Sequence, residues 1–95
     1  MKQYFVYILL CNDNTYYTGV TSNLEHRMKE HDSGKYPDSY TYKRRPVELK
    51  FFNTFKDVEE AILFEKKIKK WSKAKKVALI NSEFEKLPNL AKKKF

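Results

Sequence analysis

The sequence predicts an α/β fold of the α+β type, in which helices flank a three-stranded, mainly antiparallel sheet in the order β-β-α-β-α-α. Two runs of β-forming residues lie on either side of a turn cluster, and a third follows a polar loop. Three segments with helical periodicity begin at capping residues. A chain of 95 residues is too short for two stable cores, so we expect residues 1–95 to form a single domain.

The predicted strands come first. Residues 4–10 are rich in aromatic and β-branched side chains and end at the turn cluster Asn12-Asp13-Asn14. Residues 15–20 return as a second strand, so the pair forms an antiparallel hairpin. Residues 47–55 form the third strand, because apolar and charged side chains alternate along its first half.

The first predicted helix is capped by Thr21 or Ser22 and runs to about Asp32. His26 and Glu30 face away from the stripe that must meet the sheet, which carries Leu24, Arg27, Met28 and His31. Residues 33–46 then form a polar loop.

A capping box at Asp57 and Glu60 opens the second helix, which extends to about Lys70. A third helix begins at Ser72. Pro88 ends helical structure, and the basic tail, about residues 89–95, is expected to be frayed.

The net charge of +8 is placed unevenly: residues 1–64 are neutral overall, and residues 65–95 carry the entire excess. Such a surface favours a polyanionic partner, nucleic acid before membrane, although a solvated lysine-rich face is the alternative. The longest apolar run, Tyr4–Cys11, is too short to span a bilayer. One cysteine excludes a disulfide framework within the chain and indicates a reducing cytoplasm.

Glu65 emerges from the core-facing stripe of the second helix, in which Val58, Ala61, Ile62 and Ile68 also lie. A buried carboxylate requires a cation, hydrogen bonds or a metal. It therefore indicates either a functional site or a structural salt bridge, for which Arg27 is a candidate partner.

Several motifs follow one another in a characteristic order. Val6-Tyr7-Ile8 precedes Tyr17-Thr18-Gly19 by ten residues, and the stretches YTGVTSNLEHRMKEH and EEAILFEKKIKKWSKAKKVALI follow. From residue 3 to about residue 81 the chain resembles the GIY-YIG nuclease superfamily, and in particular its small stand-alone bacterial members. The resemblance implies catalytic roles at five positions, Tyr7, Tyr17, Arg27, His31 and Glu65.

The resemblance also implies that Glu65 is the metal ligand and that the cofactor is a single Mg²⁺ or Mn²⁺ ion. Such hard cations keep most of their waters and need few carboxylates. A guanidinium at Arg27 suits phosphate oxygens. Either Tyr7 or Tyr17 can be the general base. The chain departs from the family pattern at Val6, Thr18 and Val20, and Asn81 is the nearest match to a late asparagine.

The first functional hypothesis is therefore a divalent-metal-dependent endonuclease that hydrolyses DNA, in repair or recombination. A second is a catalytically weak binding module that holds DNA through its basic side chains. A third is a protein-interaction adaptor that uses Leu63 and Trp71. The residues expected to contact DNA are Lys66, Lys69, Lys70, Lys73, Lys75, Lys76, Arg44 and Arg45.

Overall fold

The computed structural model describes residues 2–82 and confirms the predicted order of elements. The strands are β1 (Tyr4–Cys11), β2 (Tyr16–Thr21) and β3 (Val47–Phe55), and the helices are α1 (Leu24–Ser33), α2 (Val58–Lys69) and α3 (Lys73–Ile80). A short 3₁₀ helix, Tyr42–Arg44, lies in the loop that the sequence predicted to be irregular. Pro88 and the basic tail lie outside the described residues.

The sheet has the strand order β2-β1-β3, and both pairs are antiparallel. Tyr7 of β1 lies opposite Gly19 of β2. Because β1 is central, its side chains are covered on both faces and four consecutive residues, 6–9, are fully buried. The outer edge of β2 is not paired within the sheet, so it is open to a groove between the helices.

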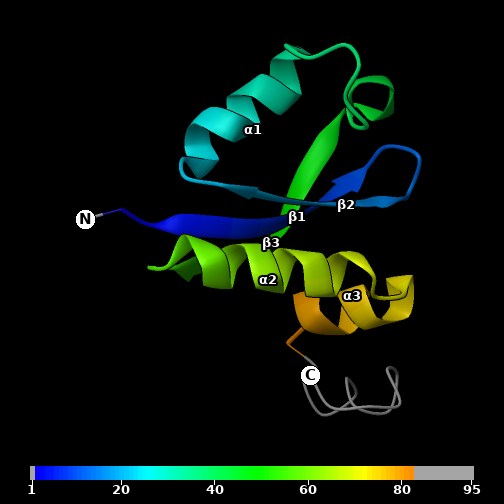
Figure 1. Cartoon of the computed structure of the whole chain (residues 1–95). Coiled ribbons are helices and arrows are strands. Elements are labelled where there is room, and N and C mark those ends of the chain that lie inside the picture. Colours follow the sequence, from blue (N-terminus) through cyan, green and yellow to red (C-terminus); the bar gives the residue numbers. More distant parts are fainter. Residues whose placement is uncertain (1, 83–95) are drawn as a thin grey trace.

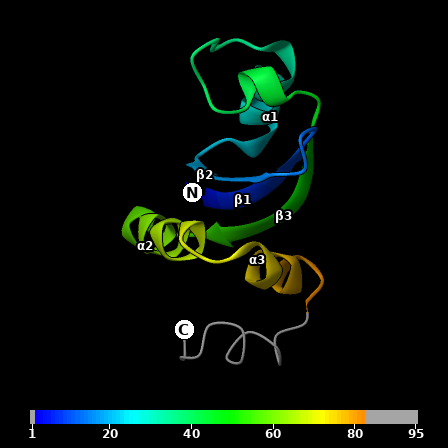
Figure 2. The same ribbon diagram turned by 90° about the vertical axis from the view of Figure 1, so that its right-hand side faces the viewer.

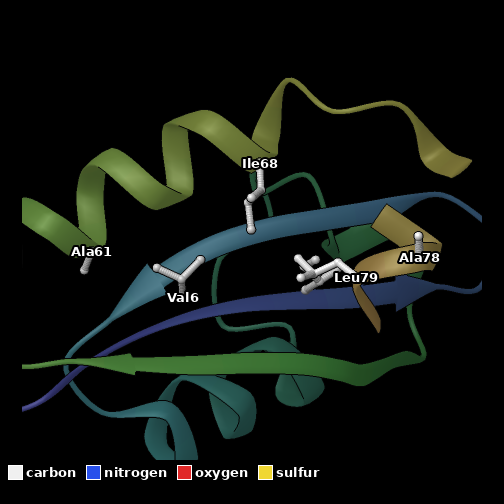
Figure 3. Close-up of a cluster of buried hydrophobic side chains, with 6 residues drawn as sticks. Val6, Ala61, Ile68, Ala78 and Leu79 are labelled. Atoms are coloured by element: carbon white, nitrogen blue, oxygen red, sulfur yellow. The ribbon is translucent and has the colours of Figure 1, made fainter. Parts of the chain in front are cut away.

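The helices lie on opposite sides of the sheet, with α1 on one side and α2 and α3 on the other (Figures 1 and 2). Val6 and Ile8 pack in a cluster with Ala61 and Ile68 of α2 and with Ala78 and Leu79 of α3 (Figure 3). Side chains alternate along a strand, so Tyr7 faces α1. The apolar core therefore lies on the side of the sheet that α2 and α3 cover, and the hydroxyl of Tyr7 lies on the side of α1. Within residues 2–82, no helix combines the length and the apolar character of a membrane span.

The cap predicted for α1 is wrong by one to two residues. Asn23 is the N-cap, and its side chain accepts a hydrogen bond of 3.0 Å from the backbone N–H of His26. Thr21 instead closes a turn ahead of the helix, where its hydroxyl accepts from the Asn23 N–H. The caps predicted at Asp57 and Ser72 are confirmed, since each side chain accepts from a backbone N–H of the first turn.

Candidate active site

A buried hydrogen-bonded chain joins β1 to α1. The Tyr7 hydroxyl lies 3.0 Å from Nε2 of His31, and Nδ1 of the same ring lies 2.9 Å from the hydroxyl of Thr41. Burial, and then the neighbouring Tyr17, raise the pKa of Tyr7 well above its ordinary value. Burial, and then the charge of Arg27, lower the pKa of His31. Both groups are therefore neutral at pH 7, and the bond joins a phenol to a neutral imidazole.

Tyr17 and Arg27 converge on the same point. The Tyr17 ring lies 6.3 Å from the Tyr7 ring and 5.6 Å from that of His31, centroid to centroid. Arg27 lowers the pKa of Tyr7 through its charge and a hydrogen bond, and so opposes the larger effect of burial. The structure thus brings together four of the five residues that the resemblance implies. Tyr7 is fully enclosed, whereas Tyr17 is half-buried and lines an open groove.

Glu30 is buried although the sequence places it off the stripe that meets the sheet, because the loop after α1 covers it. Its Oε1 accepts from Nε of Arg27 at 3.0 Å, and its Oε2 lies 3.2 Å from both the Lys35 ammonium and the Tyr36 hydroxyl. Burial works to raise the pKa of Glu30, but the hydrogen bonds from Lys35 and Tyr36 outweigh it and hold the pKa below its usual range. The loop after α1 folds back over this carboxylate, which the helical period could not show.

Glu65 lies on α2, on the other side of the sheet. Its side chain is 12% exposed, which confirms that it lies inward with Ala61 and Ile68. Val58 and Ile62, which the sequence placed in the same stripe, are 39% and 37% exposed, so the buried stripe is narrower than predicted. Its ion pair is with Lys69, one turn later, at 3.7 Å. Arg27 pairs with Glu30 instead. The structural salt bridge between Arg27 and Glu65, considered from the sequence, is therefore not formed among the described residues.

A groove of about 310 Å³ follows the open edge of β2 and joins the two sides of the sheet. Its lining includes Tyr17 and Tyr40 from the side of α1, and Lys69 and Lys76 from α2 and α3. Lys69 is the residue that pairs with Glu65. The groove thus reaches from Tyr17, on the side of α1, to Lys69, the ion-pair partner of Glu65, around the edge of β2.

Arg44 and Arg45, both predicted to bind DNA, are engaged within the loop 33–46. Arg44 pairs with Asp13 at 2.9 Å, donates to the carbonyl of Tyr40 at 2.7 Å, and lies over the Tyr40 ring. Arg45 donates to the carbonyl of Tyr42 and lies over that ring. Their main structural effect is to hold the loop against β1, β2 and α1.

The predicted basic segment is divided between exposed and buried side chains. Lys66, Lys69, Lys70 and Lys73 are exposed. Lys75 is buried with its ammonium 3.8 Å from the centre of the Trp71 ring, and Lys76 is buried beside the groove. Lys73 donates to the carbonyl of Asn14 at 2.9 Å, which ties α3 to the β1–β2 turn.

The remaining candidates lie away from this cluster. Trp71 packs partly against the apolar core, as expected of a structural tryptophan, whereas Leu63 is largely exposed on α2. Asn81 is the C-cap of α3, where its N–H donates to the carbonyls of Val77 and Leu79. Both bonds are made by the backbone of Asn81 and do not involve its side chain.

Sequence reasoning missed three residues that shape the site. Glu30 holds Arg27, Thr41 holds His31, and Tyr40 stacks on Tyr17 with 5.9 Å between ring centroids. Two of them come from the loop 33–46, whose tyrosines were the available signal. A run of aromatic and basic residues in a polar loop indicates that the loop packs on something.

Comparisons with known proteins show the family to which the chain belongs. Residues 3–78 match the family model of the GIY-YIG catalytic domain. The UPF0213 protein of Syntrophus aciditrophicus is 44% identical over 87 residues, which are 92% of this chain and 100% of the relative. The UPF0213 protein of Clostridium perfringens is 43% identical over 88 residues, covering 93% and 94% of the two chains.

A solved structure is also similar. The solution NMR structure of a UPF0213 protein from Bacillus halodurans has a TM-score of 0.55 and 39% sequence identity, and the match covers 83% of each chain. The family match extends over most of the chain and includes every candidate from Tyr7 to Glu65. This chain belongs to the GIY-YIG family, whose members form a superfamily of nucleases.

Proposed function

We propose that this chain is a divalent-metal-dependent endonuclease that hydrolyses DNA phosphodiester bonds in the cytoplasm, in DNA repair or recombination. The observation that carries the proposal is the convergence of Arg27 and Tyr17 on the buried Tyr7–His31 pair. Family membership supplies the reaction class. The chemistry requires a cation for the phosphate and a group that accepts a proton from the attacking water.

Arg27 supplies the cation. Its side chain is 38% exposed, and its ion pair with Glu30 uses Nε, so donors remain on the terminal nitrogens. A guanidinium held in this way can present two parallel N–H groups to phosphate oxygens. Because Glu30 fixes its direction, Arg27 need not lose as much side-chain entropy when DNA binds.

Tyr17 is the tyrosine that a water molecule can reach. Tyr7 is fully enclosed, and burial keeps its proton in place. Tyr17 lines the groove and lies edge-on to His31. We therefore assign the first proton transfer to Tyr17, which must give up its own hydroxyl proton to solvent in the groove before it takes one from the attacking water. Tyr7 then holds His31, which Thr41 fixes from its other nitrogen.

Glu65 would hold the divalent cation. Within residues 2–82, no three His, Cys, Asp or Glu side chains form a group suited to a metal. One carboxylate fits Mg²⁺ or Mn²⁺ nonetheless, because these ions retain several waters and accept one or two protein carboxylates. The Glu65 ion pair with the mostly exposed Lys69 is long, at 3.7 Å, and so is readily exchanged. When bound, the cation would supply positive charge to the phosphate and the leaving oxygen.

The test is cleavage of plasmid, nicked, branched and single-stranded DNA in Mg²⁺ or Mn²⁺. We expect Glu65→Gln to abolish cleavage and Arg27→Gln to lower kcat by about 10²–10³-fold, the loss typical of removing one charge-stabilising donor. Glu60→Gln is the matched control, because Glu60 is exposed on the same helix. Cleavage that survives Glu65→Gln would overturn the proposed metal site.

The binding module remains the second candidate, favoured by the exposed lysines at the end of α2 and the start of α3. Its signature would be DNA binding with no cleavage of any substrate. Binding would weaken with salt, with a slope of about −0.9 in log–log units for each phosphate contacted on duplex DNA. Tight binding that does not depend on salt would contradict this function.

A further inference from the structure

The groove along β2 contains two amines and no carboxylate among its lining residues. It is lined by Tyr16, Tyr17, Thr18, Tyr40, Lys69 and Lys76. Lys76 is 8% exposed as a whole residue, and within residues 2–82 no ion pair or hydrogen bond engages its ammonium, which keeps contact with solvent at the groove. A largely buried cation without an acidic partner loses part of its hydration, and a bound anion at this position would offset that loss.

A second observation points the same way. Burial, and then the positive charge of Lys69, lower the pKa of Lys76. Two amines close enough to repel each other therefore flank one cavity, and Lys69 is 62% exposed and able to turn toward it. Like charges gathered at a cavity without acidic groups indicate a site for an anion.

The walls of the groove suit a nucleic acid strand better than a free ion. Tyr40 stacks on Tyr17, and Arg44 and the Thr15 hydroxyl hold Tyr40 in place. The groove is open along its length and reaches Tyr17 of the candidate active site. A rigid aromatic wall beside a pair of amines is an arrangement that can follow a DNA backbone.

We propose that Lys69 and Lys76 form a subsite for a non-scissile backbone phosphate of the bound DNA strand. The proposal rests on the proposed function, because it places this phosphate next to the one that Arg27 contacts. The strand then follows the edge of β2, with its reacting phosphate on the side of Tyr17. The subsite assigns Lys76 a binding role that its burial alone would not suggest.

The experiment measures binding separately from cleavage. A short fluorescein-labelled DNA duplex is titrated by fluorescence anisotropy in EDTA, with Lys76→Gln, Lys69→Gln and the control Lys56→Gln. Lys56 is exposed in the bend between β3 and α2 and does not line the groove. We expect Lys76→Gln to weaken binding about fivefold to tenfold at about 0.1 M salt and to reduce the salt slope by about 0.9, the value for one phosphate contact. Lys56→Gln should leave both unchanged.

Two further measurements keep the result interpretable. Urea unfolding checks that Lys76→Gln still folds. If it does not, Lys69→Gln carries the test, because its side chain is mostly exposed. Titration of inorganic phosphate, followed by amide NMR shifts, should move the signals of Thr18, Tyr40 and Lys76 before others. Shifts spread evenly over the exposed lysines would overturn the subsite.

The outcomes separate the two proposals. Cleavage that depends on Glu65, together with equal binding by Lys76→Gln and Lys56→Gln, would overturn the subsite and leave the nuclease intact. Binding that weakens in Lys76→Gln, with no cleavage of any DNA, would support the subsite as part of a binding module. Absence of binding to the duplex by the unchanged protein would overturn it.

Discussion

At the scale of single residues, Gly19 makes room for Tyr7. The two are cross-strand partners, and a Cβ at position 19 would lie 2.5 Å from the Tyr7 hydroxyl oxygen. Atoms that are not hydrogen-bonded cannot approach so closely, and the buried ring has no space to withdraw. The glycine of the second motif is thus required by packing and not by an unusual backbone angle.

We expect Gly19→Ala to destabilise the protein by about 1–3 kcal/mol, as overpacking of a filled core does. The same change should lower any DNA cleavage, because the displaced phenol no longer supports His31. Urea unfolding followed by circular dichroism measures the first effect. An unchanged midpoint would show that the sheet moves to admit the methyl group.

Two titrating residues make stability depend on pH in the same direction. The pKa of His31 is lowered in the folded state, so the unfolded chain binds a proton first and stability falls as the pH drops below about 6.5. The pKa of Glu30 is also lowered, and its contribution is lost at still lower pH. We expect the urea midpoint to fall between pH 7.5 and pH 5.5.

The His31→Gln variant isolates the first of these effects. It should show a smaller fall in the midpoint between the same two pH values, because the group that must take up a proton is gone. His26→Gln is the matched control, since His26 is largely exposed. A fall of the same size in His31→Gln and in the unchanged protein would contradict the assignment to His31.

At the scale of elements, one face of α2 carries both the residues that pack against the sheet and the predicted site residue Glu65. Ala61 and Ile68 anchor the helix against Val6 and Ile8, and Glu65 lies between them, near the edge of β2. Because Ala61 and Ile68 are buried on either side of Glu65, they fix the position of its carboxylate relative to the sheet. Without these apolar contacts the position of the Glu65 side chain would be less well defined.

Two isoleucine-to-alanine changes in α2 should destabilise the protein by different amounts, because one residue is buried and the other is partly exposed. Ile68→Ala should destabilise the protein by about 2–5 kcal/mol, because it leaves a cavity in a fully buried site. Ile62 is 37% exposed on the same helix, so Ile62→Ala should cost clearly less. Chemical denaturation of both variants makes the comparison. Equal losses would mean that α2 does not pack through this stripe.

At the scale of the whole molecule, the candidate site is assembled from both sides of the sheet. Arg27 and its neighbours belong to the side of α1, and Glu65 belongs to the side of α2 (Figure 2). Each charged group has its own local partner, Glu30 for Arg27 and Lys69 for Glu65. The two halves therefore do not depend on each other for stability.

A double-mutant cycle tests this independence. In EDTA, the unfolding free energy changes of Arg27→Gln and Glu65→Gln should add to within about 0.5 kcal/mol, as expected of sites without shared partners. Glu65→Gln alone should cost less than about 1 kcal/mol, because its partner Lys69 is mostly exposed. A large coupling energy would instead indicate that Arg27 and Glu65 interact, as in the salt bridge that the sequence allowed.

The sequence by itself determined the order of the elements, two of the three helix caps, the inward stripe of α1, and the inward positions of Ala61, Glu65 and Ile68 in α2. These features depend on residues within one or two turns of each other, so their period and capping side chains are visible locally. The family motifs likewise led us to predict site roles for Tyr7, Tyr17, Arg27, His31 and Glu65. What the sequence could not determine is which groups these residues contact.

The tertiary structure decided those contacts. In the structure Arg27 forms an ion pair with Glu30, Tyr40 stacks on Tyr17, and Lys76 lines the groove along β2. The second and third join residues that are far apart along the chain. The first is an i, i+3 pair within α1, which the sequence left open because Glu65 was an alternative partner for Arg27. No periodic pattern encodes how loops and helices dock on a sheet, because docking is set by the shapes of surfaces that exist only after the elements have formed.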